Sequence, residues 1–267
     1  MAKDVDTKLE EQPHSYFKGK NVIAVMSAQH GNGKTWLAIS LAQVLGSLKQ
    51  KVLLFDASGG LNNIKNQLGL ENCPDLDEVV YGDSSLNQVA VTYAKGHFDV
   101  ILGNYKSSGL STMSIGSLQI FSDDLNIVSQ HYDTTILDID SIAVDASNVL
   151  SYMSKSIIVV CNDNVSSITE SYKLIRDLYA HCPHSSIGVV VNQVNNYIDG
   201  KRAYDSLLQA CDHFLNERPI LLGLIRDDTR VRDSIRSQST IINRYPAAEA
   251  SEDVVLTAKE IINKWKV

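Results

Sequence analysis

A glycine-rich turn near the start of the chain holds the residues best suited to chemistry. An apolar run at 21–27 (NVIAVMS) leads into AQHGNGKT at 28–35, and a stretch with helical apolar spacing follows. Glycines at 31 and 33 would let successive backbone N–H groups point at phosphate oxygens, and the helix N-terminus adds partial positive charge. Lys34 would then reach the outer phosphates of a nucleotide, and the Thr35 hydroxyl would bind Mg²⁺. The pattern predicts a phosphate-binding loop, although Ala28 replaces its usual first glycine.

The elements that must position this loop can be read from the apolar pattern. Short apolar runs suit buried strands, and stretches with helical spacing at 35–48, 167–178 and 202–214 lie between several of them. This alternation predicts an α/β fold with a mostly parallel, twisted sheet flanked by helices on both faces. Ligands of such sheets bind beyond the carboxyl ends of the strands. The expected strands are 21–27, 52–56, 98–102, 135–138, 157–161, 187–192 and 220–225.

Length and composition favour one globular domain. Of the 267 residues, 1–19 are polar and charged without a helical apolar stripe, so we expect a flexible N-terminal arm and a single domain at 20–267. No apolar run approaches the ~18 residues of a membrane-spanning helix. The four scattered cysteines form no C-x-x-C pair, which favours reduced thiols in a cytoplasmic protein over a zinc site or disulfides.

The net charge is −7, which disfavours nonspecific DNA binding, because that binding needs Lys and Arg to neutralise phosphates. An arginine-rich stretch at 226–244 is interleaved with aspartates. It can be interpreted as a solvated helix face or as a surface that binds a partner or DNA. The helical pattern at 254–267 also has two interpretations, namely packing as the last helix of the fold or weak peripheral membrane contact.

Several motifs together resemble one family. The phosphate loop is similar to the deviant Walker A loop S-G-K-G-G-V-G-K-T of the ParA/MinD family, and LLFDASGGLNN at 53–63 is similar to its switch segment. SITESYKLIR at 167–176 and the segments 223–225 and 245–251 resemble the FlhG/FleN branch, which regulates flagellar number. The resemblance covers about residues 20–265.

This resemblance implies a single-domain P-loop NTPase fold with ATP and Mg²⁺ as ligands. It implies that Asn192 holds adenine, although an ordinary turn asparagine is the alternative. Asp56 and Asp138 match the family's catalytic carboxylates, and Thr35 and Asp138 match its metal site. The nucleotide-binding residues implied by the match are Gly31, Asn32, Gly33, Lys34, Thr35, Trp36 and Asn192.

Three departures put hydrolysis in doubt. Gln29 replaces the signature lysine that crosses to the partner's phosphates, and it carries no charge. Ser58 replaces the aspartate that positions the attacking water. Asp140 adds a carboxylate beside Asp138, and the sequence leaves open which of the two faces the metal. We therefore expect nucleotide binding with weak or absent hydrolysis.

By resemblance, the chain is expected to be a bacterial, cytoplasmic regulator of flagellar number or placement, located at a pole or peripherally at the inner membrane. The implied partners are a second copy of the chain in a homodimer, the flagellar SRP-type GTPase, C-ring proteins and a flagellar transcription regulator. Two alternatives remain. One is a pseudo-ATPase that localises a pilus or another machine independently of nucleotide, and the other is a ParA-like DNA-partitioning ATPase.

Overall fold

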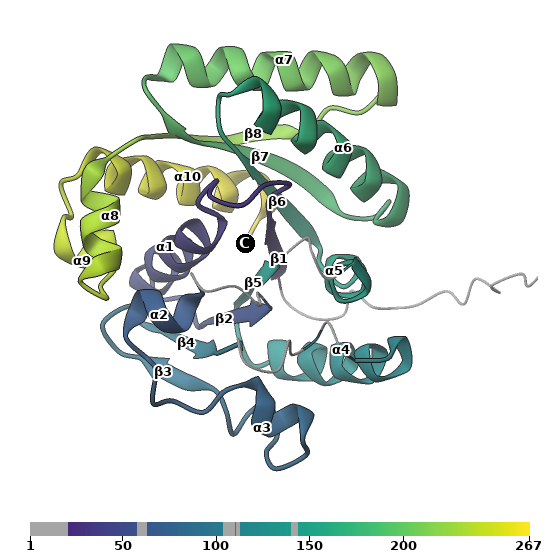
Figure 1. Cartoon of the computed structure of the whole chain (residues 1–267), viewed down its shortest axis with the longest axis vertical. Helices are drawn as coiled ribbons and strands as arrows, with labels where there is room; N and C mark the ends of the chain where they lie inside the picture. The colour runs from purple at the N-terminus through teal and green to yellow at the C-terminus, as the bar shows by residue number, and fades with distance from the viewer. Residues whose placement is uncertain (1–20, 58–62, 104–109, 111–112, 140–143) are drawn as a thin grey trace, which may run out of the picture.

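A computed structural model of the chain describes residues 21–57, 63–103, 110, 113–139 and 144–267 (Figure 1). Within these residues, eight strands form one sheet in the order β3-β4-β2-β5-β1-β6-β7-β8. All neighbours are parallel except the edge pair β3 and β4. The strands are β1 (Asn21–Met26), β2 (Val52–Ala57), β3 (Val91–Tyr93), β4 (Phe98–Ile101), β5 (Thr134–Ile139), β6 (Ser156–Cys161), β7 (Ser186–Val194) and β8 (Ile220–Arg226).

Helices cover both faces of the sheet, as the apolar strands predicted. Successive strand residues belong to two separate cores, so Val22 and Ala24 pack on one face while Ile23 and Val25 pack on the other. The helices are α1 (Lys34–Ser47), α2 (Ile64–Leu68), α3 (Leu76–Val80), α4 (Ile115–Ser129), α5 (Val144–Tyr152), α6 (Val165–His181), α7 (Tyr197–Leu215), α8 (Thr229–Arg236), α9 (Ile241–Arg244) and α10 (Glu249–Trp265).

All seven predicted strands are present, and the predicted α/β fold is confirmed. The sequence reading missed β3, which is three residues long and carries an exposed Thr92 between less exposed neighbours. So short a strand has no resolvable periodicity of its own, and it forms only by pairing with β4. The predicted N-terminal arm, 1–19, lies outside the described residues.

The C-terminal segment packs as the last helix of the fold. The buried stripe of α10 includes Val254, Ala258, Ile261 and Trp265, and the helix contacts β8 and α1. Since these apolar side chains lie in the core, the structure supports the packing interpretation. Among the described helices, none is both long enough and apolar enough to cross a bilayer.

The cysteines are free thiols, and three of the four are buried. Burial raises the pKa of Cys161 to about 12 and the pKa values of Cys182 and Cys211 to about 11. A thiolate is the reactive form of cysteine, so these three side chains act as small core residues.

Candidate nucleotide-binding site

The glycine-rich turn adopts the conformation that phosphate binding requires. Gly31 and Gly33 have φ angles of 85° and 83°, a left-handed region that disfavours side chains. Gly33 caps the N-terminus of α1, so the unpaired N–H groups of the first helical turn face the same space as the loop. A Cβ atom on Gly33 would lie 2.3 Å from Asn192 Nδ2, whereas one on Gly31 would meet no atom within 4 Å.

Asn32 anchors the loop through its buried side chain. Its Nδ2 donates to Ser27 Oγ at 3.0 Å and to Ser167 Oγ at 3.1 Å, and its Oδ1 accepts from Asn162 Nδ2 at 3.1 Å. The amide therefore ties the turn to the start of α6. This leaves the Asn32 main chain, rather than its side chain, to face a ligand.

The C-terminal end of β7 holds the turn from the other side. Asn192 Nδ2 donates to the Asn32 carbonyl at 2.8 Å, and Gln193 Nε2 donates to the Gly31 carbonyl at 3.0 Å. Gln193 has a φ angle of 60° where the pairing of β7 with β8 shifts register. The sequence analysis named Asn192 but not Gln193, because the contact of Gln193 with the loop depends on the irregular backbone at this point of β7.

A buried ion pair joins the loop to the central strands. Lys34 Nζ lies 3.0 Å from Asp138 Oδ1 at the end of β5, and the Asp138 side chain is fully buried. Asp56 on β2 lies beside Asp138 in register, and its Oδ2 accepts from the Ile64 backbone N–H at 3.1 Å. The two predicted catalytic carboxylates are thus neighbours behind Lys34.

This arrangement fits a magnesium-bound nucleotide. Asp138 Oδ2 is buried and accepts no hydrogen bond from the described residues, an uncommon state for a carboxylate oxygen. Thr35 follows Lys34 in the first turn of α1. Mg²⁺ is usually held by one or two protein oxygens together with water and phosphate, so it needs no larger cluster of ligands. The described residues contain no group of three or more His, Cys, Asp or Glu that could hold a metal by themselves.

A cleft of about 540 Å³ opens over the loop, within the size range of small-ligand sites. All seven predicted nucleotide-binding residues line it, so residues from the start of α1 and the end of β7 meet there. Further lining comes from Gln67 on α2, from Arg226 at the end of β8, and from Val231, Arg232 and Ile235 on α8. No local pattern marked Gln67 or Ile235 as site residues.

Most arginines beside the cleft are held by carboxylates. Arg226 pairs with Asp253 at 2.9 Å and Glu249 at 2.8 Å, and hydrogen bonding to Asp253 raises the pKa of its guanidinium. Hydrogen bonding from Arg230 lowers the pKa of Asp228, the N-cap of α8. These pairs support the interpretation of the stretch at 226–244 as a solvated helix face. Arg232 lines the cleft without an ion pair to any described residue, so its charge is available to a ligand there.

The residues behind the predicted loss of hydrolysis are only partly described. Gln29 Nε2 donates to Ser166 Oγ at 2.8 Å, so the residue at the signature position is bound to its own chain. Ser58 and Asp140 lie outside the described residues. Asp138 lies beside Lys34, and its assignment as the metal-binding carboxylate stays a prediction.

Trp36 should report occupancy of the cleft. It is one of two tryptophans, is buried against the cleft, and its Nε1 donates to no described residue. In a Trp265→Phe variant we expect Trp36 emission to change saturably with added Mg·ATP, because a ligand alters its surroundings. In the reciprocal Trp36→Phe variant, Trp265 should stay unchanged, since it lies against Gly188 at the opposite end of β7. Equal responses from both variants in a fluorescence titration would contradict this placement.

Comparison with known proteins agrees with this geometry. Residues 23–241 match the family described as the CobQ/CobB/MinD/ParA nucleotide binding domain. The chain is 30% identical over 249 residues to the antiactivator FleN of Pseudomonas aeruginosa, covering 91% of this chain and 86% of that protein. It is 21% identical over 259 residues to the flagellum site-determining protein YlxH of Helicobacter pylori, covering 95% and 87%.

A solved structure shares the whole fold. The septum site-determining protein MinD from Pyrococcus horikoshii, complexed with Mg-ADP, superposes with a TM-score of 0.78 at 18% identity, covering 93% of this chain and 99% of that one. The family match spans most of the sequence and includes the glycine-rich loop, both central carboxylates and Asn192. The chain therefore belongs to the CobQ/CobB/MinD/ParA family of nucleotide-binding domains.

Proposed function

We propose that this protein is a Mg·ATP-binding regulator of flagellar number or placement, with weak or absent ATP hydrolysis. The observation that carries the nucleotide part is the Lys34–Asp138 pair behind a glycine-rich loop, with one Asp138 oxygen that accepts no hydrogen bond from the described part of the chain. The flagellar part is supported by similarity to FleN and YlxH across nearly the whole chain. Within the family, these two relatives carry names that refer to flagellar or antiactivator roles.

The loop residues would bind the phosphates. Backbone N–H groups of 31–36 would donate to phosphate oxygens, and Lys34 would add a positive charge. Thr35 and Asp138 would hold Mg²⁺, which neutralises phosphate charge when bound. A cation beside Asp138 would replace the charge that Lys34 supplies, so Lys34 could turn from this carboxylate toward the phosphates without leaving it unpaired.

Weak hydrolysis follows from what the chain lacks. Phosphoryl transfer depends on positioned charges and a positioned nucleophile. Gln29 brings no charge and is held by Ser166 of the same chain, and Ser58 cannot orient water as a carboxylate would. The ligand would then stabilise one state of the protein rather than drive a rapid cycle.

The partners proposed are those implied by the resemblance. They are a second copy of the chain, the flagellar SRP-type GTPase, C-ring proteins or a flagellar transcription activator, met in the cytoplasm at a cell pole or at the inner membrane. The acidic net charge supports protein partners over DNA.

Calorimetric titration with Mg·ATP tests the proposal. We expect micromolar binding by the wild-type protein, at least about a hundredfold loss in Lys34→Ala, and no change in the exposed-lysine control Lys201→Ala. Phosphate release should stay near background even at saturating ATP. Absence of binding in the wild type would overturn the nucleotide part and favour a nucleotide-independent localisation adaptor. Rapid turnover would overturn the proposed weak hydrolysis.

A further inference from the structure

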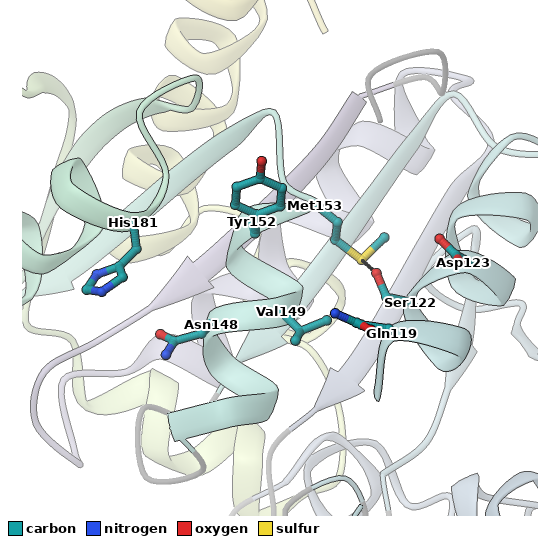
Figure 2. A pocket seen from close by; sticks show the side chains of 8 residues that line it. All are labelled: Gln119, Ser122, Asp123, Asn148, Val149, Tyr152, Met153 and His181. Carbon is teal, nitrogen blue, oxygen red and sulfur yellow. Dashed lines mark hydrogen bonds between the residues drawn. The ribbon is translucent and has the colours of Figure 1, made fainter. Parts of the chain in front are cut away.

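A second hollow lies between α4 and α5, with His181 at the end of α6 also in its lining, and it shares no residue with the nucleotide cleft. Its volume is about 350 Å³. Figure 2 shows Val149 and Met153 facing Gln119 and Ser122 across the hollow. The Met153 Sδ accepts a hydrogen bond from Ser122 Oγ at 3.5 Å, so this hydroxyl is already satisfied. The interior of this groove is therefore suited to an apolar side chain.

The outer surface of α4 extends this apolar character. Its core face carries Leu118, Phe121, Leu125 and Val128, yet two aliphatic side chains lie on the opposite side. Ile120 is 67% exposed and Ile127 is 55% exposed, and their spacing of seven residues places them on one face of the helix. Tyr152 on α5, 43% exposed, lines the groove. Exposed apolar groups with a polar rim are typical of a protein-binding surface.

The charge around the groove indicates which kind of partner it can bind. The sequences of α4 and α5 contain three aspartates and neither lysine nor arginine. Asp123 lines the groove, and both Asp123 and Asp124 are exposed on α4 between Ile120 and Ile127. An acidic rim repels phosphate-rich surfaces such as nucleic acid and anionic membranes, and it attracts Lys and Arg. The complementary ligand presents apolar residues along one helical face and basic residues beside them.

We propose that the α4–α5 groove binds a basic amphipathic helix of a partner protein. This proposal rests on the proposed regulatory function only in that a regulator needs a protein partner. The binding itself does not require nucleotide. An apolar anchor enters the hollow over Val149 and Met153, while a neighbouring apolar residue packs on Ile120. Basic residues on the flanks of the helix then pair with Asp123 and Asp124.

Two labelled peptides test this surface with the full chain and without nucleotide. Each is a helix-forming peptide of about 14 residues with leucine at i, i+3, i+4 and i+7; one carries lysine at its other positions and the other glutamate. Fluorescence anisotropy should show saturable binding of the lysine peptide and at least about tenfold weaker binding of the glutamate peptide. Raising the salt concentration should weaken the lysine complex.

Substitutions locate the binding site. Ile120→Ser and the double change Asp123→Lys/Asp124→Lys should each weaken the lysine peptide about five- to tenfold or more. The matched controls are Ile198→Ser and the double change Asp205→Lys/Asp212→Lys on α7, which alter an exposed isoleucine and two exposed aspartates elsewhere and should leave affinity unchanged. Circular dichroism of each variant checks that the fold is retained.

Four results would overturn the proposal. Equal losses of peptide affinity in the α7 controls would mean that the peptide is attracted generally to an acidic protein. Equal binding of the lysine and glutamate peptides would mean that the aspartates do not select a basic partner. Sedimentation showing self-association that Ile120→Ser abolishes would assign the face to a second copy instead. Calorimetry with Mg·ATP on the wild-type protein separates the two proposals, because nucleotide binding without binding of the lysine peptide rejects the groove alone. Peptide binding without nucleotide binding rejects only the proposed nucleotide function.

Discussion

Lys34→Ala will destabilise the nucleotide-free protein by about 3–5 kcal/mol, far more than the loss of a surface lysine. The reason is that the substitution leaves the Asp138 carboxylate without its cation. Asp138 is fully buried, and Lys34 Nζ at 3.0 Å is the cation paired with it among the described residues. The other oxygen of this carboxylate already accepts no hydrogen bond from them. Removal of the lysine therefore leaves an uncompensated charge in the core. Urea-induced unfolding without nucleotide measures the effect.

A double-mutant cycle separates this charge effect from lost packing. Asp138→Asn keeps the shape of the side chain and removes its charge, so Lys34→Ala/Asp138→Asn should be more stable than Lys34→Ala alone by about 1–3 kcal/mol. Lys201→Ala, which breaks an exposed pair with Asp205, should change the free energy of unfolding by less than about 1 kcal/mol. If the double variant were no more stable than the single one, the ion pair would not be what holds the loop to β5.

Gly33→Ala will nearly abolish nucleotide binding, while Gly31→Ala will weaken it much less. Both residues have left-handed φ angles, so each alanine costs about 1–2 kcal/mol in backbone strain. Only at position 33 does the new Cβ collide with a neighbour, at 2.3 Å from Asn192 Nδ2. Asn192 must then move, and its hydrogen bond to the Asn32 carbonyl is lost. The loop and the proposed adenine contact are disturbed by the same methyl group.

The two glycine variants form a matched pair because they differ in surroundings rather than in backbone conformation. We expect an affinity for Mg·ATP at least about a hundredfold lower in Gly33→Ala and less than about tenfold lower in Gly31→Ala, measured by calorimetry. Thermal unfolding of both variants should show whether the losses arise in the folded state. Equal losses of affinity would contradict a specific role for the contact between Gly33 and Asn192.

Short-range patterns determined much of this protein. A buried parallel strand is a run of apolar residues whatever its neighbours are, so seven strands could be predicted from composition and length alone. The phosphate loop was equally local, because its glycines, its lysine and the helix that follows occupy consecutive positions. Asp56, Asp138 and Asn192 were implied by the family resemblance, and each lies near the end of an expected strand, where ligands of parallel sheets bind.

Contacts between distant segments were decided only in three dimensions. The sequence suggested Asn32 as a ligand residue, yet its side chain is occupied by Ser27, Asn162 and Ser167. Gln193 holds the loop only because β7 ends beside it. The groove between α4 and α5 likewise has no sequence signature, since it depends on how two helices pack on the sheet. Periodicity shows which side of an element is apolar, whereas the neighbours of that side are set by the packing of the whole chain.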